Sequence, residues 1–239
     1  MYLFNSIIII TLFTITFADN NQLPYSYKGG WPVNLTSNEI LDPGYDLPCP
    51  GEIGCECRES NDCHNSNCVS HPKGNFCMPK EGEIFPRFEA LDQFGESVDL
   101  YDFAHQNKMI LIELSAAWCS PCKDIASWIT MDDPQVKENR WWKDRYLPIK
   151  EMISNEEVQL INIMYEGFEK KITVTHDDVV QWYKTYPDTS VPVLADEYKF
   201  VHSWVKPTGL PCIILLDQNM RIIKFTNRGL NDAFLYLTR

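Results

Sequence analysis

The sequence has few basic residues, and they form no run longer than Lys170-Lys171. Among 239 residues there are 21 Lys and Arg against 33 Asp and Glu, which gives a formal net charge of −12. Nucleic-acid binding requires a basic surface that neutralises phosphates. The composition therefore predicts no nucleic-acid partner, and the acidic balance of the whole chain fits basic or neutral partners without selecting among them.

After its first 18 residues the chain also lacks an apolar run long enough to cross a membrane. The uncharged stretch 7–17 is rich in Ile, Thr and Phe and is followed by Ala18 and Asp19. Because an apolar run that ends at a small-x-small site is typical of secretion, residues 1–18 are predicted to be a signal peptide cleaved before Asp19. The mature protein is then secreted or periplasmic. The alternative is an uncleaved anchor, in which case the membrane would be a partner.

Composition divides the rest of the chain into three zones. Residues 19–48 are rich in Asn, Pro, Tyr and Gly and show no period of 2 or 3.6, which predicts an irregular leader. Residues 49–79 hold six of the nine cysteines, and residues 80–239 alternate apolar runs with amphipathic segments. The leader also carries Asn34-Leu35-Thr36, which is a glycosylation sequon if the source is a eukaryote.

The six clustered cysteines follow the spacing C-x5-C-x-C-x5-C-x4-C-x8-C from Cys49 to Cys77. Such a segment cannot fold by burial alone, because it contains too few large apolar side chains to offset the entropy of ordering the chain. In an oxidising compartment it is expected to be held by three disulfides, and the sequence leaves all of the 15 possible pairings open. The large apolar residues of the segment are Ile53, Val69 and Phe76.

Zinc is the alternative account of this cluster, since His64 and His71 lie within it. The cluster has no C-x2-C pair, however, and Cys55-Glu56-Cys57 leaves one residue between two would-be ligands. Disulfides are therefore the preferred interpretation. The segment is expected to be a structural or docking module rather than the site of an activity.

The pattern of residues 80–239 predicts a single mixed α/β domain. A hairpin is expected over 88–100, because two alternating segments flank a turn at 92–95. The stretch 131–155 is long for a connection and is predicted to contain a helical insertion. The other expected strands are 109–114, 158–164, 212–217 and 221–225, and the expected helices begin near 119 and cover 176–186 and 231–237.

The motif Cys119-Ser120-Pro121-Cys122 directly follows the first long predicted strand. A thiol at a helix N-terminus is stabilised as the thiolate by unpaired N–H groups and the helix dipole, and a second thiol one turn later can close a disulfide. Pro121 fits the first turn, where its missing N–H costs no hydrogen bond, and Lys123 adds positive charge. A zinc site would need a second cysteine pair, but only Cys212 follows. The motif therefore favours thiol–disulfide exchange, in which the thiolate is the nucleophile.

The run Trp118-Cys-Ser-Pro-Cys-Lys123 after a buried strand resembles the thioredoxin superfamily. The hairpin sequence Phe88-x-Ala-Leu-Asp-x-x-Gly-x-x-Val-Asp-Leu100 is similar to the extracytoplasmic redoxin or TlpA-like branch of that family. The resemblance covers most of 83–239 and excludes the cysteine-rich segment. It implies a thioredoxin-like α/β fold, with a mixed central sheet flanked by helices, an N-terminal β-hairpin and a helical insertion, to which the small disulfide-rich module is added.

The resemblance also implies roles for individual residues. Cys119 corresponds to the exposed attacking cysteine and Cys122 to the buried resolving one. Glu113 corresponds to a buried acid, whose pKa desolvation would raise and which would take or relay the Cys122 proton, although it could also be an ordinary sheet residue. Leu210-Pro211 matches the cis-proline loop that faces the disulfide and pairs with a substrate peptide. Trp118 would form part of the substrate surface beside Cys119.

Three features bear on departures from the family pattern. Cys212 follows the expected cis-proline, where the family more often has Thr or another small residue; a buried inert thiol is expected, with a third redox thiol as the alternative. The insertion carries Trp141 and Trp142, which are expected to pack or to shape a partner groove. A peroxidase would resemble this fold but would have a T-x-x-C context, whereas Ala116 precedes Cys119 by three residues.

The family resemblance implies a thiol-disulfide oxidoreductase, with reduction of protein disulfides as the preferred activity. Its partners would be a protein disulfide as substrate and a thiol electron donor. Two alternatives are a disulfide oxidase that uses the same residues and a non-catalytic secreted binding module with a structural Cys119–Cys122 disulfide. Neither an organic cofactor nor a metal is predicted.

Overall fold

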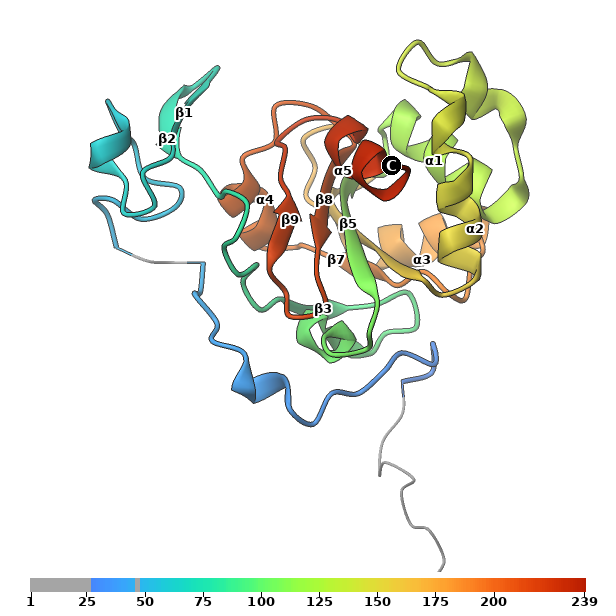
Figure 1. Cartoon of the computed structure of the whole chain (residues 1–239). Helices are drawn as coiled ribbons and strands as arrows, with labels where there is room; N and C mark the ends of the chain where they lie inside the picture. Colours follow the sequence, from blue (N-terminus) through green and yellow to red (C-terminus); the bar gives the residue numbers. More distant parts are fainter. Residues whose placement is uncertain (1–26, 46–47) are drawn as a thin grey trace, which may run out of the picture.

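A five-stranded mixed sheet forms the centre of the computed structural model, which describes residues 27–45 and 48–239 (Figure 1). The strand order is β7-β6-β5-β8-β9. Strand β6 runs parallel to both β5 and β7, whereas β8 runs antiparallel to β5 and β9. This order is that of a thioredoxin-like fold, as expected. The strands are β5 (Met109–Ala116), β6 (Val158–Glu166), β7 (Val193–Ala195), β8 (Cys212–Leu216) and β9 (Ile222–Lys224).

Helices cover both faces of this sheet, because alternate side chains of each buried strand point to opposite sides. One face packs against α1, α2, α3 and α5, and the other packs against α4 and the short helix at Leu100–Phe103. Among the described residues, no helix is long and apolar enough to span a membrane. The helices are α1 (Ser120–Met131), α2 (Pro148–Ser154), α3 (His176–Thr185), α4 (Phe200–Val205) and α5 (Asn231–Leu237).

Most elements lie where the sequence predicts them. The expected hairpin is formed by β3 (Glu89–Leu91) and β4 (Ser97–Asp99), which pair in antiparallel register. The helical insertion is also present, since two 3-10 turns, Pro134–Glu138 and Asp144–Tyr146, precede α2. The two tryptophans of the insertion pack against the helical layer, with the ring centroids of Trp128 and Trp142 4.8 Å apart.

Two elements were not expected from the sequence, β7 and α4. Strand β7 has three residues, too few to show alternation, and it forms because β6 offers a parallel edge to it. Helix α4 has six residues and depends on Asp196, whose carboxylate accepts hydrogen bonds from the backbone N–H groups of Phe200 and His202. Both elements owe their form to tertiary contacts.

The described part of the leader, 27–45, is irregular but packs firmly on the domain. The Tyr27 hydroxyl donates to Oδ2 of Asp102 at 2.7 Å, and Nε1 of Trp31 donates to Oδ2 of Asp92 at 2.8 Å. Both aromatic rings belong to the apolar cluster on the α4 face of the sheet. The predicted signal peptide, 1–18, lies outside the described residues.

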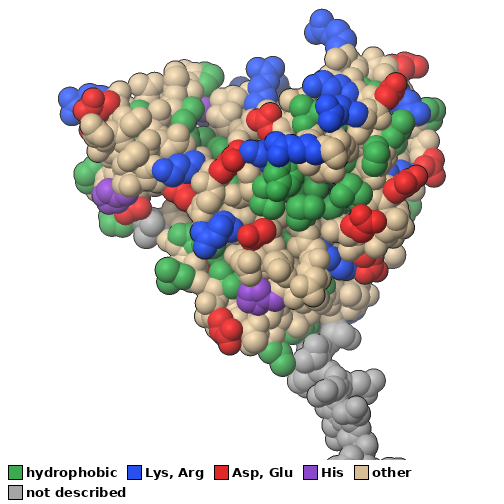
Figure 2. Space-filling view, viewed as in Figure 1, with side chains coloured by type: hydrophobic (Ala, Val, Ile, Leu, Met, Phe, Trp, Pro, Cys, Tyr) green, Lys and Arg blue, Asp and Glu red, His purple; other side chains and the backbone are tan. Residues whose placement is uncertain are grey.

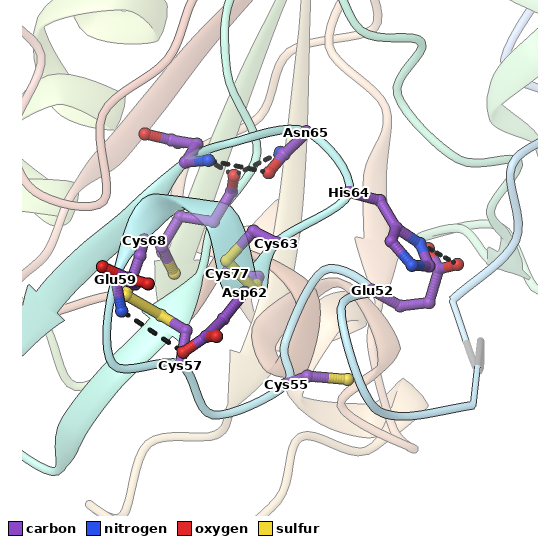
Figure 3. The surroundings of a disulfide bond; sticks show 12 residues. Glu52, Cys55, Cys57, Glu59, Asp62, Cys63, His64, Asn65, Cys68 and Cys77 are labelled. Carbon is purple, nitrogen blue, oxygen red and sulfur yellow. Dashed lines mark hydrogen bonds and ion pairs between the residues drawn. A yellow bond between two sulfur atoms is a disulfide. The ribbon is translucent and has the colours of Figure 1, made fainter.

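The cysteine-rich segment is closed by three disulfides that link residues 6, 11 and 14 apart in sequence. Five of its cysteines are labelled in Figure 3. Its hairpin consists of β1 (Cys68–His71) and β2 (Gly74–Cys77). The Sγ atoms of three of its cysteines lie within 4.8 Å of one another, so two of the disulfides are neighbours. All six sulfurs are bonded, which leaves no thiolate in the segment for zinc. The pairs are Cys49–Cys55, Cys57–Cys68 and Cys63–Cys77.

Candidate redox site

The C-x2-C motif lies at the N-terminus of α1, where β5 ends. Cys119 is the N-cap residue of the helix, and its Sγ accepts a hydrogen bond from the backbone N–H of Cys122 at 3.3 Å. Pro121 occupies the first turn, as expected. The unpaired N–H groups of this turn and the helix dipole both favour negative charge at the Cys119 sulfur.

Cys119 and Cys122 are joined by a disulfide, with 5.3 Å between their Cα atoms. The expectation of an exposed Cys119 is wrong for this state: Cys119 is 1% exposed and Cys122 is fully buried. The reason is local packing, because Trp118, Phe168 and Leu210 pack against the cluster that contains both cysteines. A partner must displace part of this cover to reach the sulfur of Cys119.

Glu113 lies on β5 with its side chain buried, 2% exposed, and directly opposite Asn162 of β6. Nδ2 of Asn162 donates to Oε2 of Glu113 at 3.2 Å, while Oε1 has no hydrogen-bond partner in the described structure. Burial raises the pKa of Glu113 to about 8, although the hydrogen bond from Asn162 works in the opposite direction. A carboxyl group with this pKa can hold or release a proton near neutral pH.

Sequence reasoning identified Glu113 but missed its hydrogen-bond partner Asn162 and the side chain of Ser115, which orients Asn162. The Ser115 hydroxyl donates to Oδ1 of Asn162 at 2.5 Å, which fixes the amide so that Nδ2 faces Glu113. Both residues are buried. The signal was present in the sequence, since each residue interrupts an otherwise apolar buried strand.

A small cavity of about 20 Å³ connects Glu113 to helix α1. Its lining includes Glu113, Asn162, Ala126 and Thr130. Ala126 is one turn beyond Cys122 on the same face of α1, and Thr130 lies one turn further, so the cavity joins the carboxyl group to the second and third turns of the helix. The volume is enough for one water molecule, which needs about 10–15 Å³ of such space and polar neighbours to bind.

The Trp118 indole is held in place by residues from the end of β6 and the loop that follows. Its Nε1 donates to Oε2 of Glu166 at 2.6 Å. The same carboxylate accepts from the backbone N–H of Lys171 at 3.1 Å and lies 3.7 Å from Nζ of Lys199. The Lys170 ammonium lies 4.8 Å from the centre of the indole ring. Sequence analysis missed these partners because they are about 50 residues or more from Trp118 and share no motif with it.

The Leu210–Pro211 peptide bond is cis, as the family resemblance implied. Leu210 packs against the cluster that contains Cys119 and Cys122, and Pro211 is buried. The carbonyl of Pro211 accepts from the backbone N–H of Gly229 at 2.7 Å, which joins this loop to the segment between β9 and α5. The structure thus brings the loop to the disulfide.

Cys212 is a free, fully buried thiol that belongs to a different apolar cluster from Cys119 and Cys122. Its Sγ–H donates to the carbonyl of Thr226 at 2.9 Å. Burial raises the pKa of Cys212 well above its ordinary value, so the thiolate needed for disulfide exchange is disfavoured. These observations favour the inert thiol over a third redox thiol.

No protein-family model matches the chain, and no curated protein sequence matches it significantly. Several solved structures are similar to it. The thioredoxin domain of a thiol-disulfide oxidoreductase from Bacteroides vulgatus has 19% identity and a TM-score of 0.46, covering 66% of this chain and 96% of that one. The exposed lipoprotein thioredoxin of Streptococcus pneumoniae has 21% identity and a TM-score of 0.44, over 64% and 97% of the two chains. A peroxidoxin from Mycobacterium tuberculosis has 15% identity and a TM-score of 0.46, over 68% and 97%.

Proposed function

We propose that the protein is a thiol-disulfide oxidoreductase that reduces protein disulfides through Cys119 and Cys122. The observation that carries this proposal is the position of the pair at the N-terminus of α1, the helix that shares a cavity with the buried carboxyl group of Glu113. The helix N-terminus favours a thiolate at Cys119. The raised pKa of Glu113 supports a role for it in proton exchange.

In the reductive direction, the Cys119 thiolate attacks one sulfur of a substrate disulfide. A mixed disulfide forms, and the other substrate sulfur leaves as a thiolate that takes up a proton. Cys122 then loses its proton and attacks Sγ of Cys119, which releases the second substrate thiolate. The substrate gains two electrons and two protons, and the protein ends as the Cys119–Cys122 disulfide. A thiol donor must return two electrons and two protons to complete the cycle.

Glu113 supplies the proton acceptor for Cys122 in this scheme. A carboxyl group with an ordinary pKa would already be ionised at neutral pH and would be a weak base, whereas burial raises the pKa of Glu113 to about 8. The cavity beside it, which is lined by Ala126 and Thr130 of α1, has room for one water molecule that would carry the proton from the helix to the carboxyl group. By resemblance to reducing members of the family, Pro121 and Glu113 also favour the reductive direction over the oxidative one.

The three disulfides between Cys49 and Cys77 support an extracytoplasmic location, because such bonds persist in oxidising compartments. The proposed location is the outside of the cell or the periplasm. In either space a reductase needs a dedicated thiol donor, since the surroundings keep cysteines oxidised.

One observation favours a second candidate function. Cys119 is 1% exposed, as expected for a structural bond in a binding module and unlike a ready nucleophile. This alternative gives no reason, however, for an acid with an unpaired oxygen to be buried in β5, the strand that leads to the pair, at a cost in desolvation. The reductase is therefore preferred.

The deciding experiment is the reduction potential of the Cys119–Cys122 pair, measured by thiol trapping in glutathione or dithiothreitol buffers. A value near about −250 mV, similar to thioredoxin, is expected for a reductase. A value near about −120 mV would instead indicate an oxidase. Resistance to reduction well below about −300 mV would indicate a structural bond and the binding module.

A further inference from the structure

Positive charge gathers around the redox disulfide, although the chain as a whole is acidic. Four segments contact the pair or the loop beside it: 117–123, 167–175, 206–211 and 225–230. Together they contain five Lys or Arg and one acid, Glu169, while Asp124 and Glu166 directly adjoin them. This leaves 16 bases and 32 acids for the rest of the chain. We call these five bases the basic rim; they are Lys123, Lys170, Lys171, Lys206 and Arg228.

The rim approaches the disulfide from several sides. Lys170 stands over the indole of Trp118, and Lys123 lies 6.0 Å from the ring centre of Phe168, so both cations lie against aromatic rings that cover the cysteines. Arg228 packs so closely on Gly209, beside the cis-proline loop, that an added Cβ there would be 3.0 Å from the arginine side chain. A partner that reaches Cys119 must therefore pass among these cations.

The acids near the basic rim leave its cations without ion pairs. Some lysines remote from the site form ion pairs with acids, as in Lys108–Glu156, Lys150–Asp132 and Lys224–Glu81, and others, such as Lys73 and Lys137, form none among the described residues. In the described part of the chain, no member of the basic rim makes such a pair. The nearest acid, Glu166, is bound to Trp118, Lys171 N–H and Lys199.

Lys206, a member of the basic rim, contacts the cysteine-rich segment. Lys206 lies with its Nζ 4.5 Å from the ring centre of Phe76 in the cysteine-rich segment. Partial burial lowers the pKa of Lys206, and the charge of Lys73 lowers it further. In Figure 2, Lys and Arg side chains lie mostly over the upper part of the molecule, where α1 and α5 lie in Figure 1.

We infer that the redox site is built to receive an acidic protein segment, so that its substrate is a disulfide flanked by Asp or Glu residues. The inference rests on the reductase function proposed above and adds the chemistry of the substrate. Carboxylates on the partner would compensate the basic rim and steer the partner disulfide toward Cys119, a contribution that raises association rates by roughly 10 to 1,000-fold in charged clefts. The negative charge of the rest of the protein would repel the same partner elsewhere, which confines its approach to this end.

The test uses three synthetic peptides that each contain the same intramolecular disulfide flanked by Asp/Glu, by Ser/Asn or by Lys/Arg. The full-length protein is reduced with dithiothreitol and desalted, and the second-order rate of peptide reduction is measured at several salt concentrations. At about 10 mM ionic strength the Asp/Glu peptide is expected to react at least about tenfold faster than the Lys/Arg peptide. At about 1 M salt the two rates should agree within about twofold, because the Debye length falls to about 3 Å.

A triple variant assigns the preference to the basic rim. Lys123→Gln, Lys170→Gln and Arg228→Gln together should bring the rate with the Asp/Glu peptide close to the rate with the Lys/Arg peptide, so that the ratio of the two rates approaches one. The matched control carries Lys108→Gln, Lys150→Gln and Lys224→Gln, which removes the same charge away from the site and should keep the ratio close to the wild-type one. If the first triple variant does not fold, Lys170→Glu alone should lower the ratio, since it places a carboxylate over Trp118.

The outcomes separate the two levels of the argument. Equal rates for the three peptides would overturn the charge preference and leave the reductase intact. Equal loss of preference in both triple variants would overturn the assignment to the basic rim in favour of net charge. Reduction of none of the peptides, together with a potential well below about −300 mV, would overturn the reductase and with it the inference.

Discussion

The cysteine-rich segment and the N-terminus of α1 both contain disulfides, but they use them in opposite ways. In the segment, three bonds link residues 6, 11 and 14 apart and constrain a stretch with very few large apolar side chains. At α1, one bond links residues three apart in a domain that already has extensive apolar cores on both faces of its sheet. Folding needs the first group of bonds and has little need of the fourth.

The surroundings of the sulfur atoms show the same contrast. The segment surrounds its bonds with turns and a two-stranded hairpin (Figure 3), whereas the Cys119–Cys122 bond has a helix N-terminus, a buried carboxyl group and a rim of unpaired cations. Those three features change the ionisation of thiols and the approach of partners. The comparison teaches that the role of a disulfide is set by its electrostatic surroundings and by how much of the fold depends on it.

Removal of the proposed nucleophile should have the largest effect on activity and little effect on stability. Cys119→Ser should lower the rate of protein-disulfide reduction on the order of 1,000-fold or more, because no thiolate remains at the N-terminus of α1. The free energy of unfolding should fall by no more than about 2 kcal/mol, since the lost loop is very short. Insulin reduction and urea unfolding measure the two quantities. Unchanged exchange with a large loss of stability would show that the bond is structural.

Glu113→Gln removes the buried titratable group that distinguishes the surroundings of the Cys119–Cys122 bond from those of the three disulfides in the cysteine-rich segment. Burial raises the pKa of Glu113 in the folded state to about 8, above about 4.3 in the unfolded chain. The protonated carboxyl group therefore favours folding, and its contribution is complete below about pH 4 and lost as the pH rises through 8. Oxidised wild-type protein should lose up to about 5 kcal/mol relative to Glu113→Gln over this range.

Urea unfolding of the wild type and of Glu113→Gln at pH 5, 7 and 9 provides the measurement. The difference between the two proteins isolates the carboxyl group, because the other titrating groups are shared. Parallel stability curves would contradict the raised pKa. In reduced protein, the same substitution should remove the step near pH 8 from the pH profile of exchange.

A double substitution in the cysteine-rich segment tests whether its disulfides stabilise the fold. Replacing both Cys63 and Cys77 by Ala removes the disulfide with the longest loop, 14 residues, and should destabilise the segment by about 3 kcal/mol. Reduction of a neutral peptide should stay close to the wild-type rate, because neither residue belongs to the redox site. Amide hydrogen exchange, resolved by segment, shows whether protection is lost in 49–77 alone. A comparable loss in β5 and α1 would show that the two regions fold as one unit.

The smallest expected effect sharpens the role of the carboxyl group. In the wild type, the hydrogen bond from Asn162 to Oε2 of Glu113 lowers the pKa of that carboxyl group. Asn162→Leu removes this hydrogen bond. The pKa of Glu113 should therefore rise, and the step in the pH profile of exchange should move to higher pH. The free energy of unfolding at pH 7 should fall by about 2 kcal/mol, because the hydrogen bond from Ser115 is lost as well and each hydrogen bond contributes about 1 kcal/mol. Asn162→Asp would be a poor control, because it adds a second acid beside Glu113.

Local patterns predicted the main elements well, because they depend on short-range information. The apolar run at 109–114 and the C-x2-C motif are each contained in a few residues, and both are found where expected, as β5 and the start of α1. The buried Glu113 was also recognisable as a lone acid in an apolar strand. Each of these features needed no knowledge of what packs beside it.

The features that sequence analysis missed are those formed by distant segments. Helix α4 depends on the buried Asp196 at its start, and the indole of Trp118 is positioned by Glu166, which is 48 residues away. The burial of Cys119 is a further example, since its cover comes from Phe168 and Leu210 on separate loops. The net charge of −12 gave no sign of the basic rim, because a sum over the chain carries no information on where the charges lie.

The chain carries its own potential substrates, and this has a consequence for how long the protein lasts. Under the proposed function, the Cys119–Cys122 dithiol attacks disulfides of other proteins and shares its chain with three further disulfides. The segment 49–77 is therefore expected to resist attack by its own chain and by neighbouring copies. Cys57, Cys63 and Cys77 are buried, which denies a thiolate its line of approach, whereas Cys49 is exposed. In a reducing environment, Cys49–Cys55 should therefore be the first of the three disulfides to be reduced. The rate at which Cys49–Cys55 is reduced would then determine how long the protein stays intact.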